Sequence, residues 1–135
     1  MSLSEQARAF LDEPRFASLA TINPDGSVQQ TVMWYAVRDD QVMMNTARGR
    51  KKDRNMLRDQ RISICVEDGY RYVSIRGSVT LVEEQTQAQA DIHSLAVRYH
   101  GQERGDEMAR DVFGPEERIT FLLPIEHAIE NGFDR

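Results

Sequence analysis

Apolar and polar residues alternate along much of the chain with the period of two that is typical of β-strands. This pattern predicts strands over residues 16–22, 27–37, 41–46, 61–67, 70–82 and 117–125. Turn-forming residues separate them, most clearly in Asn23-Pro24-Asp25-Gly26, where Pro presets φ and Gly accepts a positive φ. The first three strands are therefore expected to form an antiparallel meander.

Apolar residues three or four positions apart predict the helices. One such stripe predicts an N-terminal helix that ends at Pro14. Others predict a short helix after residue 50 and helices over 83–99 and 106–113. Short antiparallel strands with helices around them favour a mainly β protein with peripheral α-helices. A closed or split barrel is expected, because closure removes exposed strand edges.

Length and composition fit one domain. With 135 residues and 40% hydrophobic content, the chain is long enough for one core and too short for two, so residues 1–135 are expected to form a single domain.

No apolar run approaches the roughly 20 residues that span a bilayer, and the first residues lack a basic leader followed by an apolar core. These features predict a cytoplasmic protein. The single cysteine, Cys65, is expected to be a packed strand thiol.

A cationic stretch over residues 45–55 joins the third strand to the short helix and contains the only two lysines, Lys51 and Lys52. Residues 48–61 carry seven Lys and Arg against two Asp, in a chain whose net charge is −5. A positive island on an acidic protein suggests a small anion rather than nucleic acid. A turn with Thr and Gly that opens a helix would hold a phosphate through backbone N–H groups, the helix dipole and the ammonium groups. The alternative is a solvated basic face on a surface helix.

Motifs of several other functional classes are absent. The sequence has no G-x-G-x-x-G, Walker loop or G-x-S-x-G motif, which excludes the classical nucleotide-binding folds. His93 and His100 are seven residues apart on one expected helix, but no third Cys or His has matching spacing, so no metal site is expected. Paired acidic residues lie at element ends and are poor general acid–base candidates. No catalytic residue is assigned.

The strand expected over residues 27–37 carries the only Trp. Alternation places Gln30, Val32 and Trp34 on one face and the intervening residues on the other. One face would line the core, and the other could lie under a planar ring. Tyr70 and Tyr72, after a tight turn, form a second aromatic position beside an arginine, which could equally be an exposed strand edge.

Together these segments resemble the pyridoxamine 5′-phosphate oxidase-like superfamily of split-barrel flavoproteins. The residues that carry the likeness are 16–22, the turn at 25–26, and the segments 32–34, 45–55 and 73–77. Within the superfamily, residues 46–55 are most similar to the branch of flavin/deazaflavin oxidoreductases that use coenzyme F-420. The likeness extends from the first helix to about Leu123.

The resemblance implies a six-stranded antiparallel split β-barrel of the FMN-binding type, which forms a homodimer with two cofactors at the subunit interface. In the family a strand-end Thr and an Arg/Lys pair hold the cofactor phosphate, and the ring lies along the second strand. Transferred to this chain, the phosphate residues are Thr46, Arg50, Lys51 and Lys52, and the ring residues are Gln30, Thr31, Val32 and Trp34. The remaining expected cofactor residues are Asn45, Ala47 and Asn55 of the basic stretch, and Tyr70 and Tyr72 in the wall contributed by the partner subunit.

The resemblance implies an oxidoreductase that passes a hydride between coenzyme F-420 and a small planar organic acceptor. The deazaflavin does the chemistry, and the protein supplies the phosphate anchor, the ring orientation and the exclusion of water. The chain lacks the long substrate-binding C-terminal segment of the pyridoxamine 5′-phosphate oxidases themselves, so oxidation of vitamin B6 is not expected. The alternatives are an FMN-binding reductase or oxidase with the same fold, and a non-catalytic carrier or sensor of a flavin, haem or related ligand.

The tail beyond the phosphate distinguishes the two cofactors. The deazaflavin carries lactyl-glutamate carboxylates where FMN has nothing. Arg48, Arg54 and Arg58 are the residues expected to meet such a tail. The expected partners are a small-molecule substrate and a second copy of the chain, without nucleic acid or membrane.

Overall fold

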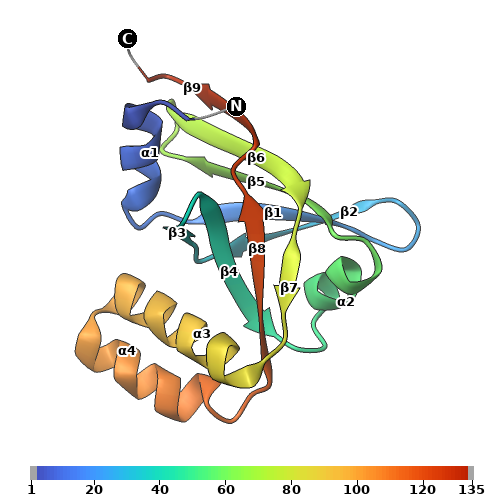
Figure 1. Cartoon of the computed structure of the whole chain (residues 1–135), viewed down its shortest axis with the longest axis vertical. Helices are drawn as coiled ribbons and strands as arrows, with labels where there is room; N and C mark the ends of the chain where they lie inside the picture. Colours follow the sequence, from blue (N-terminus) through green and yellow to red (C-terminus); the bar gives the residue numbers. More distant parts are fainter. Residues whose placement is uncertain (1–2, 134–135) are drawn as a thin grey trace.

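The computed structural model describes residues 3–133 as two antiparallel sheets with helices at their margins (Figure 1). The first sheet has five strands in the order β2-β1-β5-β6-β9, and the second has four in the order β3-β4-β8-β7. The mainly β architecture expected from the sequence is confirmed, with nine strands in the described range rather than six. No helix within this range is long and apolar enough to cross a membrane.

The five-stranded sheet consists of β1 (Ala17–Ile22), β2 (Val28–Met33), β5 (Arg61–Glu67), β6 (Tyr72–Ser78) and β9 (His127–Asn131). Along β5, Ile62, Ile64 and Val66 are buried, and the two residues between them are half-buried. Strand β1 lies between two neighbours, because Leu19 pairs with Thr31 of β2 on one side and with Ile64 of β5 on the other. One face of the sheet therefore packs against the core, and the opposite face is open.

The four-stranded sheet consists of β3 (Ala36–Arg38), β4 (Gln41–Ala47), β7 (Thr80–Val82) and β8 (Arg118–Pro124). A two-residue hairpin joins β3 to β4, and its residues Asp39 and Asp40 have φ values of 52° and 58°. Two positive φ values in succession are typical of the type I′ turn, whose twist matches that of the flanking strands. Both faces of β4 are buried, since the five-stranded sheet covers one and a helix covers the other.

Two of the expected strands divide between the sheets. The segment 27–37 becomes β2 and β3, and the segment 70–82 becomes β6 and β7. The chain also continues past β8 to form β9, which joins the first sheet. Tyr35 and Val79 lie at the two crossings and are themselves buried. Because these two residues are buried, the alternation of buried and exposed positions is not interrupted where the chain passes from one sheet to the other. Periodicity alone therefore predicts a single long strand in each of the two segments.

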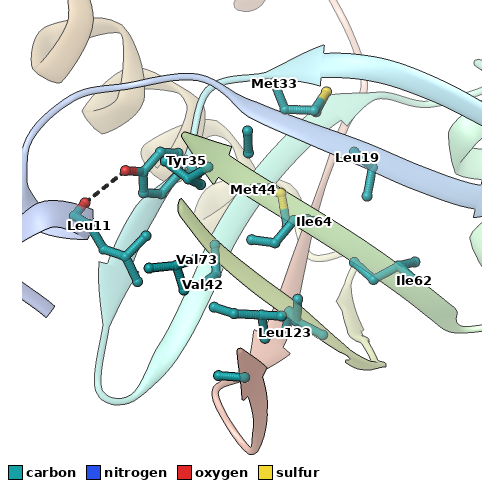
Figure 2. Close-up of a cluster of buried hydrophobic side chains, with 14 of the residues drawn as sticks. Leu11, Leu19, Met33, Tyr35, Val42, Met44, Ile62, Ile64, Val73 and Leu123 are labelled. Carbon is teal, nitrogen blue, oxygen red and sulfur yellow. Dashed lines mark hydrogen bonds between the residues drawn. The ribbon is translucent and has the colours of Figure 1, made fainter. Parts of the chain in front are cut away.

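The main core fills the space between the two sheets (Figure 2). The five-stranded sheet contributes Leu19, Ile64 and Val73, and the four-stranded sheet contributes Val42 and Met44. A smaller apolar cluster lies on the other side of β4, against a helix. The side chains that β4 and β8 direct away from the main core therefore lie under that helix, where the candidate site forms.

The helices are α1 (Glu5–Asp12), α2 (Lys51–Arg58), α3 (Gln85–His100), α4 (Gln102–Met108) and the π-helical turn η1 (Ala109–Phe113). Helix α3 packs against β4 and β8, and α4 with η1 returns along α3 (Figure 1). Gly105 allows this close approach, because a Cβ atom there would lie 2.7 Å from the Cα atom of Val97. The return brings η1 back toward the end of β2.

Tyr35→Phe is expected to lower the free energy of unfolding by about 1 kcal/mol. The Tyr35 hydroxyl donates to the carbonyl of Leu11 at 2.9 Å (Figure 2), and the carbonyl of Glu13 lies at 3.2 Å. The ring is fully buried, and burial raises the pKa of Tyr35 to about 12. Chemical denaturation measures the change, with Tyr70→Phe as the exposed control. Equal midpoints for the two variants would contradict a stabilising role for this hydroxyl.

Candidate functional site

A groove of about 360 Å³ opens where the end of β2 meets the end of β4 and the start of α2. Its far side is formed by α3, the α4–η1 segment and the start of β8. The lining residues are Val32, Met33, Trp34, Asn45, Thr46, Arg50, Lys52, Ile92, Met108, Val112, Phe113 and Arg118. Segments far apart in the sequence therefore meet at this one site.

The structure brings together about half of the residues expected from the sequence. Those that line the groove are Val32, Trp34, Asn45, Thr46, Arg50 and Lys52. Those that lie outside its lining are Gln30 and Thr31 on β2, Ala47 at the end of β4, Lys51 and Asn55 on α2, and Tyr70 and Tyr72 around the start of β6. A role in cofactor binding stays a prediction for all of them.

Asp53 shapes the turn that leads into α2. Its Oδ2 atom accepts hydrogen bonds from the Gly49 N–H at 2.7 Å and from Arg48 Nε at 3.2 Å. Gly49 has a φ of 87°, in the left-handed region that favours glycine. Arg50, the N-cap residue, offers no side-chain cap to the helix. The N–H groups of the first turn thus have no side-chain cap, which leaves them available to an anion.

Lys52 is the buried cation of the groove. It is 7% exposed, and within residues 3–133 its ammonium group has neither an ion-pair nor a hydrogen-bond partner. Burial lowers the pKa of Lys52, and the neighbouring Arg50 and Arg118 lower it further. A buried charge without a partner costs free energy, and an anion in the groove would remove that cost.

Arg118, which the sequence reasoning missed, is a second buried cation in the groove. It is 5% exposed, its Nε donates to Asn45 Oδ1 at 2.9 Å, and its Nη1 donates to Glu116 at 2.6 Å. The ring centre of Phe113 lies 4.9 Å from the guanidinium carbon. Burial lowers the pKa of Arg118, and the bond to Glu116 opposes this effect. Both buried cations lie at the same end of the groove as the start of α2.

The other part of the groove is aromatic and apolar. The ring of Trp34 stacks on that of Tyr99, with centroids 5.2 Å apart and an interplanar angle of 11°. Phe113 meets the Trp34 ring edge-on at 6.1 Å. The Tyr99 hydroxyl is held in turn by the Tyr35 N–H, which donates to it at 3.0 Å. Trp34 is therefore a fixed, flat wall, and Met108 extends the apolar lining beside it.

The three arginines expected to meet a cofactor tail are held elsewhere. Arg48 pairs with Asp53 at 3.2 Å and with Glu83 at 2.8 Å. Arg54 and Arg58 donate to backbone carbonyls, in the turn before α2 and at the end of β1 respectively. None of the three lines the groove, and a role in meeting a cofactor tail stays a prediction for them.

Asn55 attaches α2 to the β1–β2 hairpin. Its Nδ2 donates to Thr21 Oγ1 and to Asn23 Oδ1, both at 3.0 Å. It is 1% exposed, and the described contacts account for its amide. Asn55 therefore acts on the groove through the placement of the helix that carries Lys52.

The two histidines considered as metal ligands are engaged separately. His93 Nε2 lies 2.7 Å from Asp106 Oδ1, and the ring of His100 meets Trp34 edge-on at 5.4 Å. In the described part of the chain, no three His, Cys, Asp or Glu side chains are placed to share a metal ion.

Comparison with known proteins places the chain in a family. The family profile of pyridoxamine 5′-phosphate oxidase matches residues 3–117 of the chain. The chain belongs to this family. The match confirms the resemblance carried by the strand motifs and the basic stretch. A sequence search among curated proteins finds no significant match.

Solved structures with the same fold include proteins of several kinds. The conserved hypothetical protein Rv2991 from Mycobacterium tuberculosis is 29% identical, with a TM-score of 0.81 over 97% of this chain and 86% of that one. An F420 reductase is 26% identical, with a TM-score of 0.76 over 94% of this chain and 98% of that one. The heme storage protein HutZ from Vibrio cholerae, at 17% identity and a TM-score of 0.73 over 98% and 97%, shares the fold alone. The split-barrel fold expected from the resemblance is confirmed.

For this member of the pyridoxamine 5′-phosphate oxidase family, sequence reasoning missed the whole of the groove wall that follows β7. The missed residues of this wall are Ile92, Met108, Val112, Phe113 and Arg118, and Met33 of β2 was missed as well. One available signal was the spacing of four between Met108 and Val112, which places both on one helical face. Another was Arg118, a cation at the start of an apolar strand. Neither signal shows that β8 pairs with β4, which is what places Arg118 opposite Ala47.

Proposed function

We propose that this protein is a deazaflavin-dependent oxidoreductase that transfers a hydride between coenzyme F-420 and a small planar organic acceptor. The observation that carries the proposal is the largely buried Lys52, whose ammonium has no partner in the described chain, in a groove whose other part is the flat wall of Trp34. A ligand with a phosphate at one end and a fused ring system at the other complements both features. The 26% identity to an F420 reductase over almost the whole chain supports the deazaflavin.

The residues of the groove fit a cofactor of this form. Lys52, Arg50 and the uncapped N–H groups of α2 would hold the phosphate through charge-assisted hydrogen bonds. Trp34 and the exposed Val32 would flank the ring. When bound, the cofactor supplies the hydride chemistry. The described lining residues include no carboxylate, His or Cys, so the role of this chain is to bind, orient and exclude water.

The open face of the five-stranded sheet supports a homodimer. A hollow of about 650 Å³ lies on it, with small residues such as Ala20 and Ser63 in its lining. Val28, Val32 and Ile129 are 59%, 68% and 64% exposed. Apolar exposure of this kind on a sheet face marks an interaction surface. Because Val32 also lines the groove, a second copy seated on this face would help to close the groove over the cofactor.

FMN is the second candidate, and one observation favours it. Arg48, Arg54 and Arg58 make contacts within the chain, so no dedicated partner for a glutamate tail is provided by them. FMN ends at its phosphate and needs no such partner. A non-catalytic carrier or sensor of a planar ligand is the third candidate, and the turnover assay distinguishes it from the other two.

The deciding experiment is to titrate the purified protein with coenzyme F-420, FMN, FAD and haem in parallel. We expect coenzyme F-420 to bind most tightly, and reduced coenzyme F-420 to be oxidised in the presence of a quinone acceptor. Tightest binding of FMN would favour the second candidate. Tight binding without turnover of any acceptor would favour the carrier, and no binding of any flavin or deazaflavin would overturn the proposal.

A further inference from the structure

The guanidinium of Arg118 is held on every side but one. The Gln85 side chain accepts from the Arg118 N–H at 2.9 Å and donates to its carbonyl at 2.8 Å, which pins the backbone. Nε is bound by Asn45 and Nη1 by Glu116. Within residues 3–133, Nη2 has no hydrogen-bond partner, and Arg118 lines the groove. The remaining edge of the guanidinium is thus available to a ligand.

The groups that hold Arg118 are themselves fixed. Asn45 donates both to a backbone carbonyl of α3 and to a side chain of β8, at 2.9 and 3.0 Å. Gln89 Nε2 donates to the carbonyls of Phe113 at 3.0 Å and Glu116 at 2.8 Å, which holds the loop that covers the guanidinium. The side-chain entropy of Arg118 is therefore lost when the protein folds and not when a ligand binds. A contact through Nη2 then adds to the affinity with little further loss of conformational entropy.

Three cations meet at this end of the groove, where the nearby carboxylates of Glu116 and Asp53 are paired with Arg118 and Arg48. Arg50, Lys52 and Arg118 come from the N-cap of α2, its first turn and the start of β8. Arg50 and Arg118 each lower the pKa of Lys52, so the three charges are close enough to repel one another. Glu116 compensates Arg118 alone. Arg50 and Lys52 are left without an ion-pair partner in the described part of the chain, and the phosphate group of a bound cofactor would supply negative charge beside them.

We infer that Arg118 is a third phosphate-binding residue of the groove, which contacts the phosphate group of the bound cofactor through Nη2 beside Lys52 and Arg50. The identity of the ligand rests on the proposed function. The inference itself concerns the phosphate, and a phosphate without a flavin tests it independently.

The first test compares FMN with riboflavin, which has the same ring and no phosphate. Arg118→Gln is expected to lower the affinity for FMN by about tenfold or more, the typical effect of removing a charged hydrogen bond. The affinity for riboflavin should change by less than about twofold. Arg118→Lys keeps the positive charge but lacks the planar set of N–H donors of the guanidinium, so it should recover part of the lost affinity for FMN. Arg104→Gln, an exposed pair with Glu107 away from the groove, is the control.

An equal loss for FMN and riboflavin would mean that Arg118 contacts the ring or supports the fold, and would overturn the inference. No loss for either ligand would do the same. Circular dichroism of each variant shows whether it is folded. If Arg118→Gln does not fold, the comparison is made with Arg118→Lys, and the guanidinium N–H resonances of the wild-type protein are followed by ¹⁵N NMR as inorganic phosphate is added.

The second test uses inorganic phosphate alone and separates this inference from the proposed function. Phosphate should raise the unfolding temperature of the wild-type protein above its value in chloride at the same ionic strength, and should raise that of Arg118→Gln much less. If the wild-type protein binds phosphate in this manner but no flavin or deazaflavin, the proposed function fails and the inference stands. If phosphate stabilises both proteins equally, the inference fails whatever the cofactor.

Discussion

Lys52→Met is expected to weaken the binding of coenzyme F-420 or FMN by roughly tenfold to over a hundredfold, while the unliganded protein becomes more stable. Lys52 is 7% exposed as a residue, and its ammonium makes no ion pair or hydrogen bond within the described chain. Its contact with a phosphate would be a charge-assisted hydrogen bond worth roughly 1.5 to 3 kcal/mol. Without the phosphate, the same charge is a cost of folding, and an apolar side chain of similar length removes it, which stabilises by on the order of 1 kcal/mol.

The pH dependence of stability separates this effect from a general gain in packing. Burial lowers the pKa of Lys52 in the folded protein below its value in the unfolded chain. The unfolded state therefore binds more protons between these two values, and stability rises with pH across that window. The difference between Lys52→Met and the wild-type protein should be largest at neutral pH and should shrink as the pH approaches about 10.4, the ordinary pKa of lysine.

Isothermal titration with the cofactor and thermal unfolding without it measure the two halves of this prediction. Lys51→Met is the matched comparison, because Lys51 is exposed and its contact with any anion would be screened by water. It should lose no more than about fivefold in affinity and gain no stability. Unchanged affinity for the cofactor in both variants would contradict a phosphate site at the start of α2.

Ile129→Glu is expected to convert a homodimer into monomers and to lower cofactor affinity as a consequence. Ile129 lies on the open face of the five-stranded sheet and is 64% exposed, so a carboxylate there is hydrated in the monomer and does not disturb the core. In a dimer that buries this face, the same charge would be desolvated without a partner, which costs several kcal/mol. Two symmetry-related copies of the charge double the penalty in an isologous interface.

Light scattering at micromolar concentration measures the mass, and cofactor titration at two protein concentrations measures the linkage. Leu57→Glu is the control, because it places the same charge on an exposed apolar residue of α2. That variant should stay dimeric. A wild-type protein that is monomeric while it binds the cofactor tightly would contradict the dimer and the closing role of the partner.

Local patterns in the sequence determined the elements and the charge of the site. The alternation along residues 61–67 and the cationic run before α2 both correspond to elements in the structure. The exposed arginines and the buried Met56 of α2 follow from helical spacing, which depends only on residues within one turn. The basic stretch and Trp34 could be linked to a phosphate and a ring because the segments that carry the family likeness are short and contiguous.

The tertiary structure alone decided which of these residues face the groove. Lys51 and Lys52 are chemically identical neighbours, and the rotation of about 100° per helical residue buries one and exposes the other. Arg48 forms ion pairs with Asp53 and with Glu83, and Glu83 lies 35 residues further along the chain. Such a pairing leaves no trace in local periodicity.

Arg118 shows the limit most clearly. Its bond to Asn45 spans 73 residues and exists because β8 pairs with β4 while η1 folds back over both. The crossing of strands between the sheets at Tyr35 and Val79 has the same origin, since the side chains on either side of each bend stay buried. Sequence patterns determine what each element can bury and where its charges lie. The packing of elements that are distant in the chain decides which charged side chains come together without a counter-ion. Only the folded structure specifies that packing.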